Sequence, residues 1–312
     1  MSLVWGQLAT SIFRSVLLAY RGWSIWQPIL IFKINDLKGF LGFSLYQMAE
    51  RSINYAAWNL DKLLVGKVLG PLSLGFYNIA FQLMMRPFMA LNPIMTKVAF
   101  PVFASIQDDN ERLRRGYIKM IQWIALINTP IYLGMLVMAE PLIALLLGPN
   151  WNPSVTIFQI LSVLGILYSL GNPLGSLLLA KGRADLGFWI NILGVIVYFL
   201  AVLIGSRWDS IGVAWSLLLS NLCFLLPIDF WLRWYLVKMH PYEYFKRISP
   251  SLMLSLCMML CMLSVRKILP PCSLWLELSV PIVFGGLFYS LGNIYFQRAL
   301  LKDVLSLVRN IG

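Results

Sequence analysis

Long apolar runs recur from one end of this 312-residue chain to the other. Several of them reach or exceed the roughly 20 residues that a helix needs to cross the hydrocarbon core of a membrane. Only 12% of the residues are charged, whereas a soluble domain carries about 25%. The runs are too long, and alternate too weakly, to be the strands of a barrel. The sequence therefore predicts an all-α, polytopic helical membrane protein.

The apolar pattern predicts about nine spanning helices. Turns rich in Gly, Pro and Asn separate them, and the outer loops are short, without a soluble domain. The eighth run is short for a span and follows Pro250, so its helix is expected to begin near Ile248. The predicted spans are 3–20, 39–65, 72–104, 115–138, 155–180, 186–204, 211–235, 252–265 and 274–295.

Most Lys and Arg residues lie in connectors on one predicted side of the membrane, namely 21–38, 105–119, 181–185, 233–250 and 296–312. The positive-inside rule makes this side cytoplasmic. With nine spans, the amino end then lies outside and the carboxyl end lies in the cytoplasm. The net charge of +12 therefore reflects topology and attraction to anionic membrane lipids, and no nucleic-acid partner is predicted.

A polar stripe runs along the second span, from Ser44 to Lys62. At about 100° per residue its members share one face of a helix. Ionisable groups at membrane depth usually face a bundle interior or a watery cavity, so we interpret the stripe as cavity lining. The alternative is a set of charges, Glu50 with Arg51 and Asp61 with Lys62, that only fixes helix packing. The candidate cavity residues of this span are Gln47, Arg51, Asn54, Asp61 and Lys62.

The third span repeats this theme with Asn78, Gln82, Arg86 and Lys97 on one arc. Together with Arg14 of the first span, the arginines of these helices are predicted to line a cationic cavity. The planar guanidinium fork suits a diphosphate because it donates two hydrogen bonds at once.

Two further features of these spans bear on transport. Glu50 and Asp61 are expected either to pair with the cations or to bind a coupling proton or Na⁺. Pro87, Pro93 and Pro101 are expected to interrupt the third span, as in the broken helices of transporters.

Other motifs limit the function classes. The chain has no GxxxxGK[ST] motif and no GxGxxG after a strand, so an ATP-driven pump finds no support and no cofactor is predicted. It also has no GxSxG motif, the nucleophile elbow of hydrolases. His240 is the single histidine and the four cysteines suit packing, so no metal or catalytic site is predicted. Asp229 and Arg233, one helical turn apart, are expected to form a simple salt bridge.

A family resemblance rests on motifs between Trp5 and Tyr235. They include Asn59-Leu60-Asp61-Lys62, the Gly66–Gly70 turn, Gly75-Phe76-Tyr77, Phe100-Pro101-Val102-Phe103, Leu113-Arg114-Arg115, GPNWNPS (148–154) and LAKGRAD (179–185). In this combination the chain resembles Wzx-type polysaccharide flippases, of the colanic-acid-exporter kind, in the multidrug/oligosaccharidyl-lipid/polysaccharide exporter superfamily. The resemblance implies two six-helix lobes around a central cavity, often with two extra helices.

The resemblance also implies a function and a domain plan. The implied function is flipping of undecaprenyl-diphosphate-linked oligosaccharide across the bacterial inner membrane by alternating access. Residues 1–38 match the last helix of the first lobe and a connector, 39–239 the second lobe, and 240–312 two additional helices with a tail. The first five helices have no counterpart, so we expect this chain not to transport without a first lobe. A truncated gene, a misassigned start and a separately encoded first lobe all stay open.

Two other functions compete with the flippase interpretation. One is a drug or metabolite antiporter of the same superfamily, which drug efflux would distinguish. The other is a membrane polysaccharide polymerase or ligase. Such enzymes generally need a sizeable outer loop with reactive side chains, and the short outer loops weigh against one.

Overall fold

The computed structural model describes residues 2–22, 34–270, 273–298 and 300 as helices joined by short turns, with no strand among them. Side chains are described in these ranges except at 2–4, 7, 34–58, 98 and 184. The all-α class is thus confirmed. The chain divides into two compact units, Met1–Ala56 and Ala57–Gly312, and the packing below is that of the second. The lobe boundaries predicted from the sequence stay a prediction.

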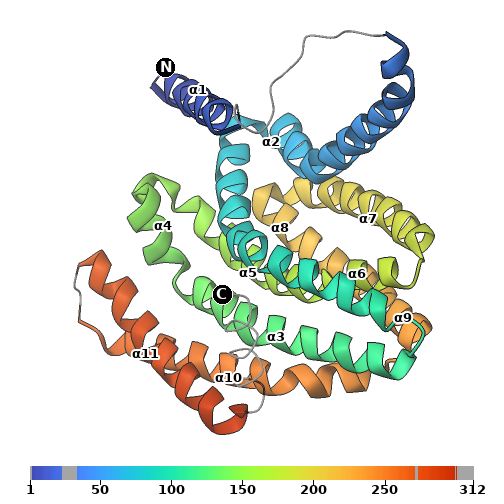
Figure 1. The fold of residues 1–312 in the computed structure, drawn as a ribbon. Coiled ribbons are helices and arrows are strands. Elements are labelled where there is room, and N and C mark those ends of the chain that lie inside the picture. Colours follow the sequence, from blue (N-terminus) through green and yellow to red (C-terminus); the bar gives the residue numbers. More distant parts are fainter. Residues whose placement is uncertain (1, 23–33, 271–272, 299, 301–312) are drawn as a thin grey trace. The chain divides into compact units, whose positions relative to one another are not determined.

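The elements follow one another along the chain as shown in Figure 1. They are α1 (Ser2–Gly22), α2 (Ile34–Ser105), α3 (Asn110–Val137), α4 (Ala139–Leu147), η1 (Pro149–Trp151), α5 (Pro153–Gly171), α6 (Pro173–Ala180), α7 (Ala184–Gly205), η2 (Ser206–Trp208), α8 (Asp209–Ser220), η3 (Asn221–Leu225), α9 (Leu226–Val237), α10 (Pro241–Ile268) and α11 (Leu274–Phe296).

The described residues contain six segments that are long and apolar enough to cross a membrane, so the predicted count of nine spans is not confirmed. One segment, Asp185–Val237, contains both the sixth and the seventh predicted spans. Another, Asn59–Ser105, contains the third span and the end of the second. The six segments agree with a multi-pass membrane protein. The count differs because the sixth and seventh predicted spans run together through η2 and η3, α2 joins the second and third across Gly70, and α1 is not among the six segments.

The helix α2 folds back on itself at Gly70, which separates two arms. Gly70 has φ 86° and ψ 174°, outside the helical region. A Cβ added at Gly66 would lie 2.9 Å from the Leu74 side chain. In a straight helix these two residues are about 12 Å apart along the axis, so the arms are antiparallel here. The Gly66–Gly70 turn predicted between the second and third spans is therefore confirmed.

We expect Gly70→Ala to destabilise the protein by about 1–3 kcal/mol, because essentially only glycine adopts this backbone conformation. Thermal unfolding in detergent measures the effect. The control is Gly75→Ala, five residues further along the same helix, where a Cβ meets nothing within 4 Å. Alanine is the better helix former, so that variant should be neutral or slightly stabilised. Equal unfolding temperatures for the two variants would contradict the strained turn.

Prolines do not interrupt the second arm of α2, contrary to the sequence prediction. Pro87, Pro93 and Pro101 lie inside the helix, and Gly70 is the residue with non-helical torsion angles in α2. Pro250 likewise lies inside α10, which begins at Pro241 rather than near Ile248. In a membrane, a broken helix would leave backbone groups unsatisfied, so the chain keeps helical torsion angles through each proline.

Local signals in the loops are confirmed. Asp109 caps α3 and accepts hydrogen bonds from the backbone N–H groups of Glu111 and Arg112, both at 3.0 Å. The Arg112 N–H, followed by that of Glu111, lowers the pKa of Asp109 below its usual value. The turn residues Gly148 and Gly182 have positive φ, at 89° and 65°.

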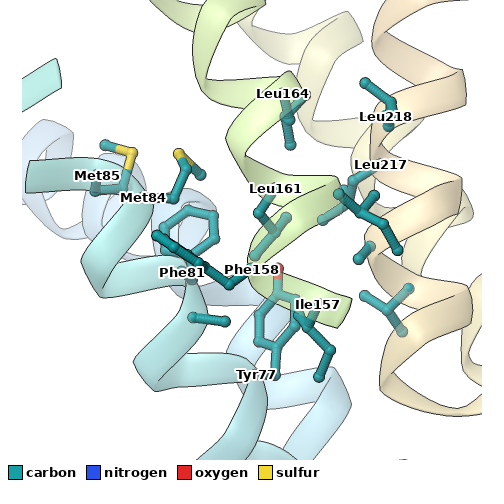
Figure 2. Close-up of a cluster of buried hydrophobic side chains, with 14 of the residues drawn as sticks. Tyr77, Phe81, Met84, Met85, Ile157, Phe158, Leu161, Leu164, Leu217 and Leu218 are labelled. Carbon is teal, nitrogen blue, oxygen red and sulfur yellow. The ribbon is translucent and has the colours of Figure 1, made fainter. Parts of the chain in front are cut away.

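The first hydrophobic core joins the second arm of α2 to α5 and α8. Figure 2 shows Phe81 and Met84 of α2 pointing toward Phe158 of α5, with Leu217 of α8 on the other side of α5. Met84, Phe158 and Leu217 are each at most 3% exposed. Burying side chains of this kind stabilises by about 1.5–3 kcal/mol each, so the second arm is held firmly against α5 and α8.

A second core joins α3, α6, α9 and the start of α10, and a smaller one attaches the last two helices. The helices α10 and α11 lie side by side, and α10 also runs along α3 (Figure 1). Small residues permit this approach, since a Cβ at Gly285 would lie 2.5 Å from the Met262 side chain. Arg266 then ties α10 to Glu140 of α4 at 2.5 Å and to Glu277 of α11 at 3.1 Å.

Candidate functional site

A polar and cationic stripe lies on the outside of the second arm of α2. Gln82, Arg86 and Lys97 are exposed on the unit Ala57–Gly312, whereas Asn78 is half-buried. On a regular helix the three exposed residues fall within about 60° of arc. Among the described residues, neither Arg86 nor Lys97 forms an ion pair. We call Gln82, Arg86 and Lys97 the α2 stripe.

The α2 stripe lies on the side of the helix opposite its buried face. Tyr77, Ala80, Phe81, Met84 and Met85 of the same arm pack into the first core. The core therefore fixes the direction in which Arg86 and Lys97 project from the helix. Two cations on an apolar span are costly to expose to lipid, by about 2.5–3.5 kcal/mol each at the bilayer centre. This cost favours a stripe that faces water.

Asp61 and Lys62 do not lie on this exposed face. The Tyr77 hydroxyl donates a hydrogen bond of 2.7 Å to Asp61 Oδ2, which links the two arms of α2. Lys62 Nζ donates to Asn59 Oδ1 at 3.1 Å and lies 5.1 Å from the centre of the Phe81 ring. The other oxygen of Asp61, Oδ1, is buried and has no hydrogen-bond partner among the described residues. The structure thus separates Asp61 and Lys62 from the α2 stripe.

The remaining predicted site residues fall elsewhere. Arg14 is exposed on α1, in the unit Met1–Ala56. The side chains of Gln47, Glu50, Arg51 and Asn54 lie outside the described residues. The cationic cavity predicted from Arg14, Arg51 and Arg86 is therefore untested as a set, and Arg86 is the one arginine of the three that the structure places on the second unit.

The sequence did not indicate a group of polar side chains that α5, α7 and η3 bring together. The Tyr168 ring of α5 packs edge-on against the Tyr198 ring of α7, with ring centres 6.4 Å apart, and Asn221 Nδ2 donates to the Tyr198 hydroxyl at 3.0 Å. Asn221 begins the π-helical turn η3, and such turns are frequent at functional sites. Three helical segments thus bring two tyrosine side chains and an amide together.

We expect Tyr77→Phe to destabilise the protein by about 1–3 kcal/mol, because Asp61 then loses the partner of its second oxygen. Thermal unfolding of purified protein measures the loss. The double variant Asp61→Leu/Tyr77→Phe removes donor and acceptor together and should recover part of it. If Tyr77→Phe and the double variant unfold at the same temperature as the unaltered protein, the hydrogen bond contributes nothing to stability.

A second polar cluster surrounds Arg233, whose side chain is 0% exposed. Its Nη2 lies 3.6 Å from Asp229 Oδ2, which confirms the predicted salt bridge. Its Nε donates to the Tyr117 hydroxyl of α3 at 3.0 Å, and its guanidinium lies 4.9 Å from the centre of the Tyr244 ring of α10. Arg233 therefore connects α9 with α3 and α10, which the spacing in the sequence did not indicate.

Comparisons with known proteins identify relatives with names in polysaccharide biosynthesis. The lipopolysaccharide biosynthesis protein WzxC of Escherichia coli (strain K12) is 38% identical over 223 residues, which are 71% of this chain and 45% of WzxC. The teichuronic acid biosynthesis protein TuaB of Bacillus subtilis (strain 168) is 32% identical over 267 residues, which are 85% of this chain and 55% of TuaB. The chain spans about half the length of these relatives.

A solved structure shares the fold. The lipid II flippase MurJ, in an inward closed conformation, superposes with a TM-score of 0.68 at 14% identity. The superposition covers 87% of this chain and 57% of the MurJ chain. A likeness at this identity shows the fold alone, and it agrees with the all-α helical class.

The family itself follows from a match to the amino-terminal half. A model of the polysaccharide biosynthesis protein family matches residues 1–156. This match and the two relatives confirm the resemblance to polysaccharide flippases of the multidrug/oligosaccharidyl-lipid/polysaccharide exporter superfamily. The chain belongs to the polysaccharide biosynthesis protein family.

Proposed function

We propose that this chain takes part in flipping oligosaccharide repeat units, linked to undecaprenyl diphosphate, across the bacterial inner membrane. The observation that carries the proposal is the α2 stripe, with Arg86 and Lys97 exposed on an apolar span and without an ion pair to any side chain that the structure describes. A diphosphate is the anionic part of such a substrate. Arginine binds phosphate oxygens through two parallel hydrogen bonds, and lysine adds a point charge.

Alternating access is the proposed mechanism, and the packing of the lobe supports it. The first core fixes the second arm of α2 to α5 and α8, so the α2 stripe moves with the lobe as one surface. We further propose the orientation expected from the basic connectors, with the amino end outside and the carboxyl end in the cytoplasm. Flipping makes and breaks no covalent bond, so the proposed role is that of a transporter and not of an enzyme.

Asp61 is the proposed site of ion coupling, with Glu50 as the second candidate. The Oδ1 atom of Asp61 is buried and has no partner among the described side chains, while its Oδ2 accepts a hydrogen bond from Tyr77. A carboxylate so placed changes its hydrogen bonding when it takes up a cation. The same observation supports the runner-up, a cation-coupled antiporter of drugs or metabolites.

Deleting the gene from its own genome separates the two functions. The flippase proposal expects lipid-linked oligosaccharide to accumulate and surface polysaccharide to fall, with drug susceptibility unchanged. The antiporter predicts the reverse pattern. Restoring the gene at its own locus should reverse the change and excludes effects on neighbouring genes. Normal polysaccharide in the deletion strain, with no accumulated lipid-linked oligosaccharide, would refute the flippase proposal.

A further inference from the structure

Aromatic and cationic side chains gather where α9 ends and α10 begins. The helix α9 ends at Lys238, which has a left-handed backbone with φ 53°, and α10 starts at Pro241. Trp231 is 54% exposed and Tyr242 is 75% exposed. We call this surface the α9–α10 corner and define it by exposed residues, namely Trp231, Trp234, Lys238, Tyr242, Phe245, Lys246 and Arg247.

The cations of this corner lie against its aromatic rings. Lys238 Nζ lies 4.4 Å from the centre of the Trp234 ring. Lys246 Nζ lies 5.9 Å from the centre of the Tyr242 ring. An ammonium group over a ring face is attracted by the ring, so both lysines are held near the surface of the lobe rather than extended into water.

Neighbouring carboxylates do not neutralise the corner, because they have other partners. Glu243 pairs with Arg114 at 3.9 Å, and Asp229 pairs with the buried Arg233 at 3.6 Å. Within the part of the chain that the structure describes, Lys238, Lys246 and Arg247 have no acidic partner. The corner therefore carries an uncompensated positive charge.

The residues beneath the corner hold it in place. Met239 and Tyr244 are 1% and 3% exposed in the second core. The Tyr244 ring also packs edge-on against Phe230, with ring centres 5.2 Å apart. The corner is thus a fixed surface at the end of two spanning segments, which end at Val237 and begin at Pro241.

We propose that the α9–α10 corner binds the anionic headgroups of bilayer phospholipids. Tryptophan and tyrosine at helix ends favour the headgroup region, which places the corner at that depth. Each lysine or arginine near the surface raises the affinity for anionic lipid by a factor of about five. The corner combines both features, and it stands independently of the proposed flippase function.

The test compares lipid binding of the full chain, purified in detergent, by native mass spectrometry. The probes are phosphatidylglycerol and phosphatidylcholine with identical acyl chains. The corner variant is Lys238→Asn/Lys246→Gln/Arg247→Gln, in which asparagine is chosen because it tolerates the left-handed backbone. The matched control removes the same charge from exposed cations at other helix ends, Lys67→Gln/Arg207→Gln/Lys267→Gln.

The unaltered protein should prefer phosphatidylglycerol, and the corner variant should bind it at least about tenfold more weakly. The control and the variant Lys238→Arg/Lys246→Arg should keep the preference, and gel filtration should show all variants folded. If the corner and control variants lose phosphatidylglycerol binding equally, the effect is one of net charge and the proposal is overturned. Loss in neither would also overturn it, as would displacement of bound lipid by farnesyl diphosphate, which would assign the corner to diphosphates.

Discussion

Replacing Arg233 with methionine is expected to lower the free energy of unfolding by about 3–5 kcal/mol. The guanidinium is fully buried, lies 3.6 Å from Asp229 and donates to Tyr117 at 3.0 Å. Methionine fills similar space but leaves Asp229 as an uncompensated charge and Tyr117 without its donor. The change is measured on purified protein by heating it and following the loss of the native peak on gel filtration.

A double variant separates the lost charge pair from lost packing. Asp229→Leu/Arg233→Met removes both charges, and replacing a buried ion pair by apolar residues is often neutral or stabilising. We therefore expect it to recover most of the stability lost in Arg233→Met. Arg266→Met is the matched control at a partly exposed ion pair, where Glu140 and Glu277 stay accessible to water, and it should cost less. If the double variant is as unstable as Arg233→Met, packing rather than charge explains the effect.

Replacing Arg86 and Lys97 by alanine in the chromosomal gene is expected to reduce polysaccharide output about tenfold to a hundredfold. This range corresponds to the net loss of one charge-assisted hydrogen bond to a phosphate, about 1.5–3 kcal/mol, from two cations that lie on the same face of α2. Quantifying surface polysaccharide and the amount of protein in membranes checks this. Neither residue contributes to the core, so the amount of inserted protein should not change.

Two further variants sharpen this result. Arg86→Lys keeps the charge but loses the two-pronged hydrogen bond, so its output should lie between those of the unaltered protein and Arg86→Ala. Lys67→Ala/Arg207→Ala removes two exposed cations outside the α2 stripe and should leave output unchanged. A loss as large in this control as in the Arg86 and Lys97 variant would point to net charge.

The sequence predicted features that depend on helical period. Asp229 and Arg233 are four residues apart, so a single helix suffices to join them. The exposure of Gln82, Arg86 and Lys97 also follows from their common face, since the opposite face is mainly apolar. Both the Asp229–Arg233 pair and the exposed α2 stripe could therefore be predicted from the periodicity of a single helix.

Features that depend on several helices were not predicted. Tyr168, Tyr198 and Asn221 belong to different segments, and each alone is typical of an ordinary core or interface residue. Their contact depends on the crossing of α5 and α7 and on the π-helical turn at η3, which no local pattern indicates. The prediction that Pro87 and Pro93 interrupt the helix was also wrong. Local preference would break the helix at these prolines, but tertiary packing keeps the segment helical.

The most direct test of the central claim is the sidedness of lipid-linked oligosaccharide in cells with Arg86→Ala/Lys97→Ala in the chromosomal gene. Inverted membrane vesicles expose the cytoplasmic face to a glycosidase or lectin that cannot cross the membrane. If the α2 stripe carries the anionic headgroup across, the variant should hold most of its lipid-linked oligosaccharide on that face, and the Lys67→Ala/Arg207→Ala control should not. An unchanged distribution and unchanged polysaccharide output with both cations replaced would contradict the account.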